Sequence, residues 1–442
     1  MSNDSRRRHT DDLYDENNME VSDEESSAVV YNKSNLNSWR NLIAFWVLGL
    51  CNNFAYVVML SAAHDILDQE EAGSNSTSVN TSTGNLVHEV SGNDSTLLEC
   101  NPIGTGAILL ADILPTLVVK LTAPFYIQVI PYRIKVILVI LFALGSFLLV
   151  ALSQTIPLSI LGVVCASISA GLGEPTFLGL STFFDRNVIS SWSSGTGGAG
   201  VLGALSYAGL TSLGVSPRTS VLIMTCVPVL MAFSYFVLLD KPDTVYGEKI
   251  DSDAEGLLSG KDKYYYGPLT WRRKLQVAKP LLYYMVPLTL VYFAEYFINQ
   301  GLHEVLYFNG IWLSPKEQYR WFQVDYQIGV FISRSSVNFI KINHLWALPV
   351  LQFVNLIILL TQVLYRYIPN VWIVFAIVLF EGLLGGGAYV NTFYKMSKEI
   401  PPEIREYSLS VATISDSAGI AVAGAVAIPV HNAICSLNIH IP

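Results

Sequence analysis

The sequence predicts an all-α polytopic membrane protein with eleven transmembrane helices in two pseudo-symmetric halves of six and five helices. Of its 442 residues, 52% are hydrophobic and only 14% are charged, which is too little charge for a set of soluble domains. Apolar runs of about 20 residues, the length that crosses the hydrocarbon core, recur between short polar turns. A segment of the first run returns in the second half of the sequence.

The predicted spans follow one another along each half. The first six cover residues 40 to 63, 103 to 124, 134 to 153, 156 to 181, 192 to 212 and 219 to 239, and the last five cover 278 to 300, 321 to 340, 345 to 365, 370 to 394 and 407 to 433. The eighth is the most polar, since it carries Gln323, Asp325, Gln327 and Arg334. Its polar face is therefore expected to lie against other helices or a water-filled cavity.

Basic residues predict the orientation, because Lys and Arg near helix ends are retained on the cytoplasmic side. With a cytoplasmic amino terminus, that side holds 21 of the 26 Lys and Arg residues and the opposite side holds four. Residues 1 to 38 form an acidic tail that is predicted to be disordered and lacks the apolar core of a signal peptide. The halves then cover residues 39 to 239 and 278 to 434, joined by a cytoplasmic linker of residues 240 to 277 and followed by a lumenal tail of residues 435 to 442.

The loop of residues 64 to 102 is predicted to be lumenal and glycosylated. It contains no Lys or Arg and three Asn-X-Ser/Thr sequons, at Asn75, Asn80 and Asn93; such sequons are acceptors in exposed lumenal loops. The five cysteines show no metal-binding or redox spacing. A lumenal disulfide between Cys100 and Cys435 is one alternative, because sequence alone does not set the pairing.

The repeated segment indicates two related halves. Phe54-Ala55 to His64-Asp65 returns 239 residues later as Phe293-Ala294 to His303-Glu304. Two further matches relate the fourth and fifth spans to the tenth and eleventh, at offsets of 210 and 221. Short matches arise by chance among small and aromatic residues, but three in register favour shared ancestry. A parallel repeat of six plus five helices is typical of a major-facilitator-like fold, in which the halves rock about a central site.

The glycine-rich run at residues 195 to 200 is predicted to serve helix packing. It lacks the Lys-Ser/Thr ending of a phosphate-binding loop, and no strand precedes it. Small residues at this density let membrane helices approach closely, and the same interpretation applies to residues 385 to 387.

Ionisable residues inside the spans are the candidates for substrate or ion binding, because a charge in the membrane is costly unless it is paired or hydrated. They are Asp112, Lys120, Glu174, Glu295, Arg334, Glu381 and Asp416. Lys120, two turns from Asp112 on one helix face, either meets an anionic ligand or pairs permanently with a carboxylate on another helix. Arg334 and Asp416 lie nearest to span ends, so snorkelling, a cytoplasmic gate and ligand contact all stay open.

Glu295 is the favoured functional residue, because it is a lone carboxylate in a central helix. Amide and phenol groups accompany it: Asn299 and Gln300 follow it, and the first half offers Asn52, Asn53 and Tyr56, with Tyr56 at the position equivalent to Glu295. Such groups suit a ligand rich in hydroxyls, since each can donate and accept. The alternative is interhelical hydrogen bonding that serves packing alone.

Two further patterns concern pH and sorting. His64 and His303 lie at the ends of the two repeated segments. An imidazole at this position can sense the pH of an acidic lumen, or it can serve only as an interfacial side chain. In the linker, Asp253 lies four residues before Leu257 and Leu258, a pattern typical of dileucine signals read by clathrin adaptors. No metal, cofactor or nucleic-acid partner is predicted, and an enzyme is not expected, because no nucleophile, base and orienting group appear at motif spacing.

Long stretches of the chain resemble the battenin family. The stretches are residues 48 to 54, 57 to 66, 110 to 117, 192 to 200, 291 to 301 and 381 to 386. The resemblance, which begins near Trp39, implies a major-facilitator-related protein of late endosomes and lysosomes, linked to juvenile neuronal ceroid lipofuscinosis. It also implies loss-of-function positions at Glu295, Arg334, Gln352 and Asp416. The family's carboxyl-terminal prenylation box is not matched, because Cys435 is not the fourth residue from the end.

The leading functional prediction is a lysosomal transporter that exports glycerophosphodiesters, such as glycerophosphoglycerol, by alternating access. This substrate class is implied by the resemblance, as are effects on lysosomal pH and autophagy. A phosphodiester anion with glycerol hydroxyls suits a buried cation beside amides and carboxylates, and Glu295 or Glu174 can carry a coupled proton. The alternatives are a non-transporting scaffold for endosome–lysosome trafficking and a transporter of basic amino acids.

Overall fold

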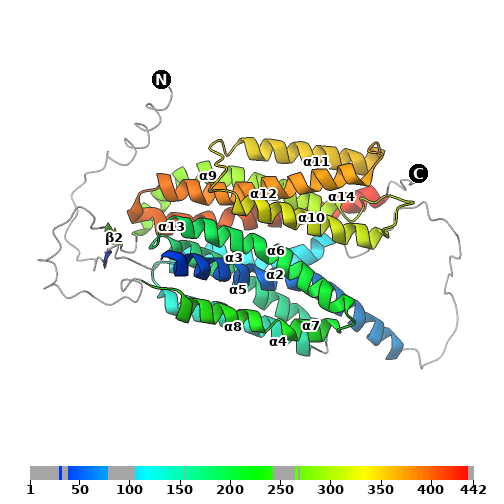
Figure 1. The fold of residues 1–442 in the computed structure, drawn as a ribbon, viewed down its shortest axis with the longest axis horizontal. Helices are drawn as coiled ribbons and strands as arrows, with labels where there is room; N and C mark the ends of the chain where they lie inside the picture. Colours follow the sequence, from blue (N-terminus) through cyan, green and yellow to red (C-terminus); the bar gives the residue numbers. More distant parts are fainter. Residues whose placement is uncertain are drawn as a thin grey trace, which may run out of the picture.

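The computed structural model describes residues 29–31, 38–77, 105–153, 155–241, 264–266 and 269–436. Over these residues the chain forms a helical bundle, and the helices of residues 38–238 gather on one side of it in Figure 1, with those of residues 271–436 on the other. The predicted sorting signal at Asp253, Leu257 and Leu258, and the sequons at Asn80 and Asn93, lie outside the described residues.

The first half contains six helical segments. They are α2 (Ser38–Thr77), α3 (Thr105–Tyr126), α4 (Tyr132–Leu152), α5 (Ile156–Ser181), α6 (Asn187–Ser212) and a broken sixth segment made of α7 (Pro217–Ile223), α8 (Cys226–Phe233) and the π-helix η1 (Ser234–Leu238). The second half contains five: α9 (Trp271–Phe297) continued by the π-helix η4 (Ile298–Leu302), α10 (Pro315–Ser335), α11 (Ala347–Tyr365), α12 (Val371–Glu399), and α13 (Pro402–Ala412) followed by α14 (Ile414–Ser436). The predicted division into six and five segments is confirmed.

Eight of the described helical segments are long and apolar enough to cross a membrane. Helices α3, α6 and α10 are not among them; α6 is rich in Gly and Ser, and α10 carries five charged residues. Their polar groups face other helices, as expected for a multi-pass bundle. The all-α class is confirmed, with one small addition: strands β1 (Val29–Tyr31) and β2 (Tyr264–Tyr266) pair antiparallel.

Several helix boundaries differ from the predicted spans. Helix α2 continues to Thr77, so it includes part of the predicted lumenal loop and its first sequon. The predicted eighth span, residues 321 to 340, was wrong at both ends, since α10 covers Pro315–Ser335. Ser314 and Glu317 form a capping box that starts α10 earlier. This polar start does not resemble a membrane span, which is why hydropathy placed the helix too late.

Glycines let the helices pack closely, as predicted for residues 195 to 200. A Cβ atom at Gly195 would collide with the backbone carbonyl of Trp46 on α2, and one at Gly386 would collide with the backbone of Val330 on α10. Both contacts need a residue without a side chain. One hydrophobic cluster contains buried residues of both halves, including Trp192 and Phe393, so the halves share a core.

The cysteines fall into two groups. Cys51, Cys165 and Cys226 are free, whereas Cys435 is disulfide-bonded. A bridge at Cys435 is what the Cys100–Cys435 alternative requires, and Cys100 itself lies outside the described residues.

Candidate functional site between the halves

Lys120 contacts two carboxylates, one in each half. Its Nζ atom lies 2.6 Å from Glu174 Oε2 and 2.9 and 3.0 Å from the two carboxylate oxygens of Asp416. Lys120 and Glu174 belong to α3 and α5 of the first half, and Asp416 belongs to α14 of the second. All three are buried, so these are charge-assisted contacts at low local dielectric. Lys120 is therefore paired with carboxylates on two other helices.

Tyr389 on α12 extends this cluster across the interface. Its hydroxyl donates to Glu174 Oε1 at 2.6 Å and accepts from the indole nitrogen of Trp192 at 3.2 Å. Glu174 and Trp192 lie in the first half and Tyr389 in the second. One carboxylate oxygen of Glu174 therefore bonds Lys120 within the first half, and the other bonds Tyr389 across the interface.

Arg334 is the second cation of the site. Its two terminal nitrogens donate to Thr196 Oγ1 at 2.7 Å and to the hydroxyl of Tyr292 at 2.8 Å, and the guanidinium carbon lies 4.3 Å from the ring centre of Tyr389. Arg334 is only 9% exposed, so it is held inside the bundle and does not snorkel. A planar guanidinium suits this place, because it can bond in two directions while stacking on an aromatic face.

The cluster lies toward one end of the bundle. Lys120 and Glu174 are within about two turns of the last residues of α3 and α5, and Arg334 is next to the last residue of α10. These helix ends are the ones predicted to be cytoplasmic. The ion pairs and hydrogen bonds between the halves therefore close the bundle near its predicted cytoplasmic end, which is what an inner gate requires.

A second buried polar group lies within the second half. The Tyr326 hydroxyl donates to Glu295 Oε1, and the Asn299 amide donates to Glu381 Oε1 at 3.0 Å. His303 Nε2 is 3.7 Å from Glu381 Oε2. Neither carboxylate forms a salt bridge with Lys or Arg in the described part of the chain. The other oxygen of each carboxylate is buried without a hydrogen-bond partner. Each therefore needs a proton or an incoming donor.

The remaining predicted residues lie inside the bundle, where Asp112, Asn52 and Gln300 are buried and Asn53 and Tyr56 are half-buried. Asp112 accepts from the Ser167 hydroxyl and, as expected, does not contact Lys120. The Asn52 amide donates to Asn53 at 3.1 Å. Tyr56 lies against Tyr296, and Gln300 is 4% exposed. The side chains of His64 and Asn75 lie outside the described ones, although α2 continues through both positions.

Sequence reasoning missed the uncharged partners. Tyr389, Tyr292, Tyr326, Trp192 and Thr196 carry the contacts that orient the charged groups. Aromatic and hydroxyl residues are common in membrane helices, so nothing in the sequence distinguishes these from packing residues. The π-helix η4, which carries Asn299 and Gln300, was also not expected. Such a local widening often occurs at functional sites.

The two halves meet at a charged interface, and their fold is of the major-facilitator type, which solved transporter structures share. The chain is similar to a bacterial homologue of the iron transporter ferroportin in an outward-facing state (TM-score 0.56, 12% identity, covering 91% of this chain and 97% of that one). It is also similar to the human organic anion transporter MFSD10 (TM-score 0.54, 13% identity, covering the same shares of the two chains).

The chain belongs to the CLN3 protein family. The family's sequence pattern matches residues 43–265 and 249–437. The chain is 47% identical to battenin of Canis lupus familiaris over 442 residues, which cover 98% of this chain and 99% of battenin. It is 35% identical to protein btn-1 of Neurospora crassa, over 90% of this chain and 89% of that protein. The predicted resemblance to the battenin family is confirmed.

Proposed function

We propose that the protein is a lysosomal transporter that exports glycerophosphodiesters by alternating access. The observation that carries the proposal is the neutral set of two cations and two carboxylates between the halves, Lys120, Arg334, Glu174 and Asp416. A phosphodiester anion can replace a carboxylate as the partner of a buried cation, because both offer two oxygens to charged donors. Buried amides and tyrosines nearby supply donors and acceptors for glycerol hydroxyls.

Coupling to protons is part of the proposal. Glu295 is buried, with one oxygen bonded to Tyr326 and the other without a partner. A carboxyl group in this position can take up a proton in an acidic lumen and release it when the site opens to the cytoplasm. Glu174 is the alternative carrier, but its two oxygens already bond Lys120 and Tyr389. We therefore favour Glu295.

Uptake of labelled glycerophosphoglycerol into vesicles bearing the purified full-length protein tests the proposal. We expect saturable uptake that a pH difference stimulates. Glu295→Gln should abolish the stimulation, while Glu403→Gln, at an exposed position, should leave it unchanged. Transport unaffected by Glu295→Gln would remove that residue from the mechanism. No uptake by the unaltered protein would reject the substrate.

The same vesicles separate the rival functions. A transporter of basic amino acids would take up lysine, and lysine would compete with the labelled substrate. A trafficking scaffold would need its cytoplasmic linker, with the dileucine-like signal that we propose binds clathrin adaptors, but not the charged interface. In cells that lack the protein, deletion of residues 242–263 should then abolish rescue of lysosomal function and autophagy, whereas Lys120→Met should not. We expect Lys120→Met to abolish rescue.

A further inference from the structure

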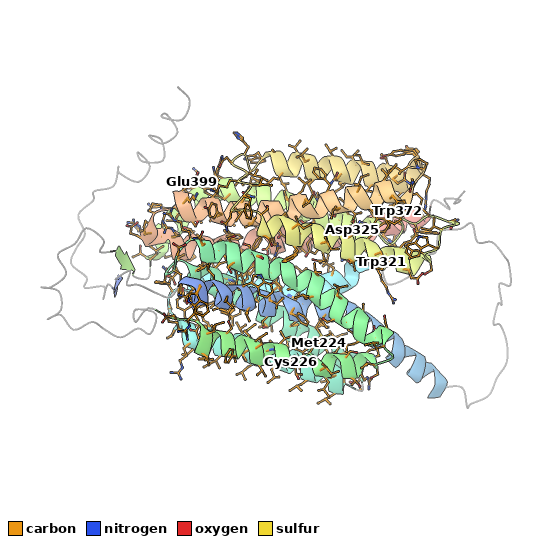
Figure 2. The ribbon with its side chains drawn as sticks, viewed as in Figure 1. Met224, Cys226, Trp321, Asp325, Trp372 and Glu399 are labelled. Carbon is orange, nitrogen blue, oxygen red and sulfur yellow. The ribbon has the colours of Figure 1, made fainter. Side chains whose placement is uncertain are left out.

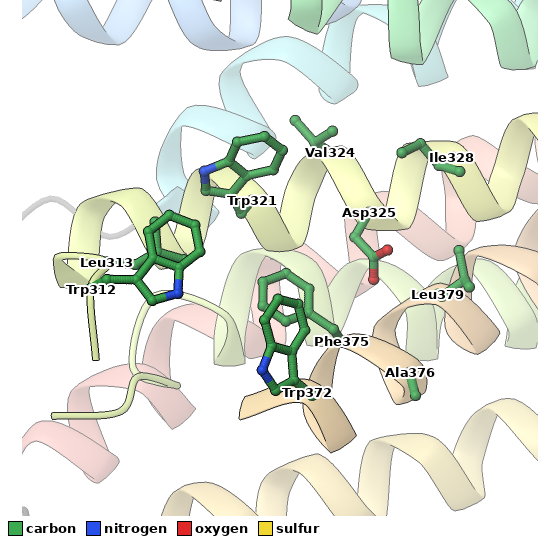
Figure 3. A pocket seen from close by; sticks show the side chains of 10 residues that line it. All are labelled: Trp312, Leu313, Trp321, Val324, Asp325, Ile328, Trp372, Phe375, Ala376 and Leu379. Atoms are coloured by element: carbon green, nitrogen blue, oxygen red, sulfur yellow. The ribbon is translucent and has the colours of Figure 1, made fainter. Parts of the chain in front are cut away.

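A groove of about 420 Å³ lies on the lipid-facing surface of the second half, away from the site between the halves. It is bounded by α10, α12 and the segment before α10, as Figure 3 shows. Its volume is in the usual range for small-molecule sites. Figure 2 shows Trp321, Asp325 and Trp372 gathered near one end of α12, with Glu399 at the opposite end.

Aromatic rings form the mouth of this groove. Trp312, Trp321 and Trp372 are 75%, 49% and 62% exposed, and Phe375 lies one turn below Trp372 on α12. Tryptophan at this level of a bundle is typical of the membrane–water interface. Three indoles and a phenyl ring around one groove also present several π faces to a ligand.

Asp325 distinguishes the groove from an ordinary aromatic belt. Its carboxylate points between α10 and α12 beside Phe375, and its Oδ2 atom is buried without a hydrogen-bond partner. No salt bridge of the described residues includes it. Helical side chains lean toward the amino-terminal end of their helix, which here is the mouth of the groove. A carboxylate on the outer surface of a membrane bundle is costly unless a proton or a cation neutralises it, and no described residue supplies the cation.

We propose that this groove binds the quaternary ammonium headgroup of a choline lipid from the surrounding leaflet. The aromatic faces and one carboxylate match a trimethylammonium group, which carries charge but has no N–H to be satisfied. A primary ammonium would bring three donors to a groove that offers one carboxylate among apolar side chains. The acyl chains would lie along the apolar residues of α10 and α12 that continue the groove, such as Ile328 and Leu379. The site is separate from the one proposed for transport and does not depend on it.

Photocrosslinking tests the assignment. The full-length protein is reconstituted in vesicles with a trace of phosphatidylcholine that carries a photoreactive group beside the choline, and mass spectrometry locates the crosslinks. We expect crosslinks in the peptides of Trp321 and Trp372. Asp325→Asn and Trp372→Leu should each lower the yield about fivefold, the factor that corresponds to about 1 kcal/mol of cation–π or ionic attraction. Trp271→Leu, an exposed tryptophan on α9 outside the groove, is the matched control and should change nothing.

Competing lipids identify what is recognised. Unlabelled phosphatidylcholine should compete, whereas phosphatidylethanolamine and a lipid with the neutral carbon isostere of choline should not. Equal competition by the isostere would mean that the groove holds apolar groups only, and equal competition by phosphatidylethanolamine would mean that it takes any ammonium; either result overturns the proposal. An unchanged yield for Asp325→Asn in a protein of unaltered thermal stability would overturn it too.

Discussion

The contact between Lys120 and Asp416 predicts how strongly each of several substitutions destabilises the protein. Lys120 Nζ lies 2.9 Å from Asp416 Oδ1 and 2.6 Å from Glu174 Oε2. At an effective dielectric constant of about 20, a separation of 2.9 Å gives a gross attraction of about 6 kcal/mol. Desolvation offsets much of this attraction, so the net coupling of the pair is expected to be about 0.5–3 kcal/mol.

The two single substitutions are not equivalent. Lys120→Met leaves two buried carboxylates without their cation, and breaking a buried pair in this way costs about 3–5 kcal/mol. Asp416→Asn keeps the contact between Lys120 and Glu174 and should cost about 1.5–3 kcal/mol, the contribution of one hydrogen bond to a charged group. In the double variant only one buried carboxylate, that of Glu174, is left without the lysine. Its loss should therefore be smaller than the sum of the single losses.

Denaturant unfolding of the four proteins in one detergent measures these free energies, and the double-mutant cycle isolates the coupling. A control cycle pairs Lys120→Met with Glu403→Gln, which is exposed and should add independently. Asp416→Asn as severe as Lys120→Met, or a double variant that is strictly additive, would refute the assignment of Lys120 as the shared cation of two carboxylates.

Single contacts lead to three further predictions. Gly195→Leu should destabilise the bundle by at least about 1–3 kcal/mol in thermal unfolding, because the new side chain meets backbone. Gly209→Ala, which has open space around it within α6, should not destabilise the bundle. Arg334→Lys should slow transport in the vesicle assay despite the retained charge, because an ammonium lacks the planar fork that reaches Thr196 and Tyr292 together while stacking on Tyr389; uptake equal to that of the unaltered protein would contradict this. Burial, with a smaller contribution from nearby Arg133, lowers the pKa of Lys241 to about 8, so its acetylation rate measured against pH should show a midpoint near 8, and a midpoint above about 10 would contradict the described packing.

The features that could be predicted are those that leave a local pattern along the amino-acid sequence. Hydropathy located the segments, and the repeated stretch that begins at Phe54 and again at Phe293 indicated the two halves. The costly residues Lys120, Glu174, Arg334 and Asp416 were found because a charge within an apolar run is visible by itself. Which of them meet was not visible, because Lys120 and Asp416 are 296 residues apart.

The π-helix and the tyrosines illustrate why the rest could not be predicted. A π-helix differs from an α-helix by one hydrogen-bond register, and the sequence Ile298–Leu302 carries no residue that requires it. Tyr389 and Tyr326 become functional candidates only through the carboxylates that their hydroxyls reach on other helices. Helix α10 was misplaced for a related reason, since its polar first turn is stabilised by a capping box and not by hydrophobicity.

The arrangement of contacts also indicates which of them must break during transport. If each half moves as a unit, contacts within one half persist, such as Lys120 with Glu174 and Arg334 with Tyr292. Contacts between the halves, such as Lys120 with Asp416 and Arg334 with Thr196, have to open. When they open, each half keeps one buried cation that has lost a partner. In the transport cycle proposed above, the free oxygens of a phosphodiester would replace the partners that these cations lose. In that proposal, the same pairing that holds the halves together would also prepare the two cations for an anionic substrate.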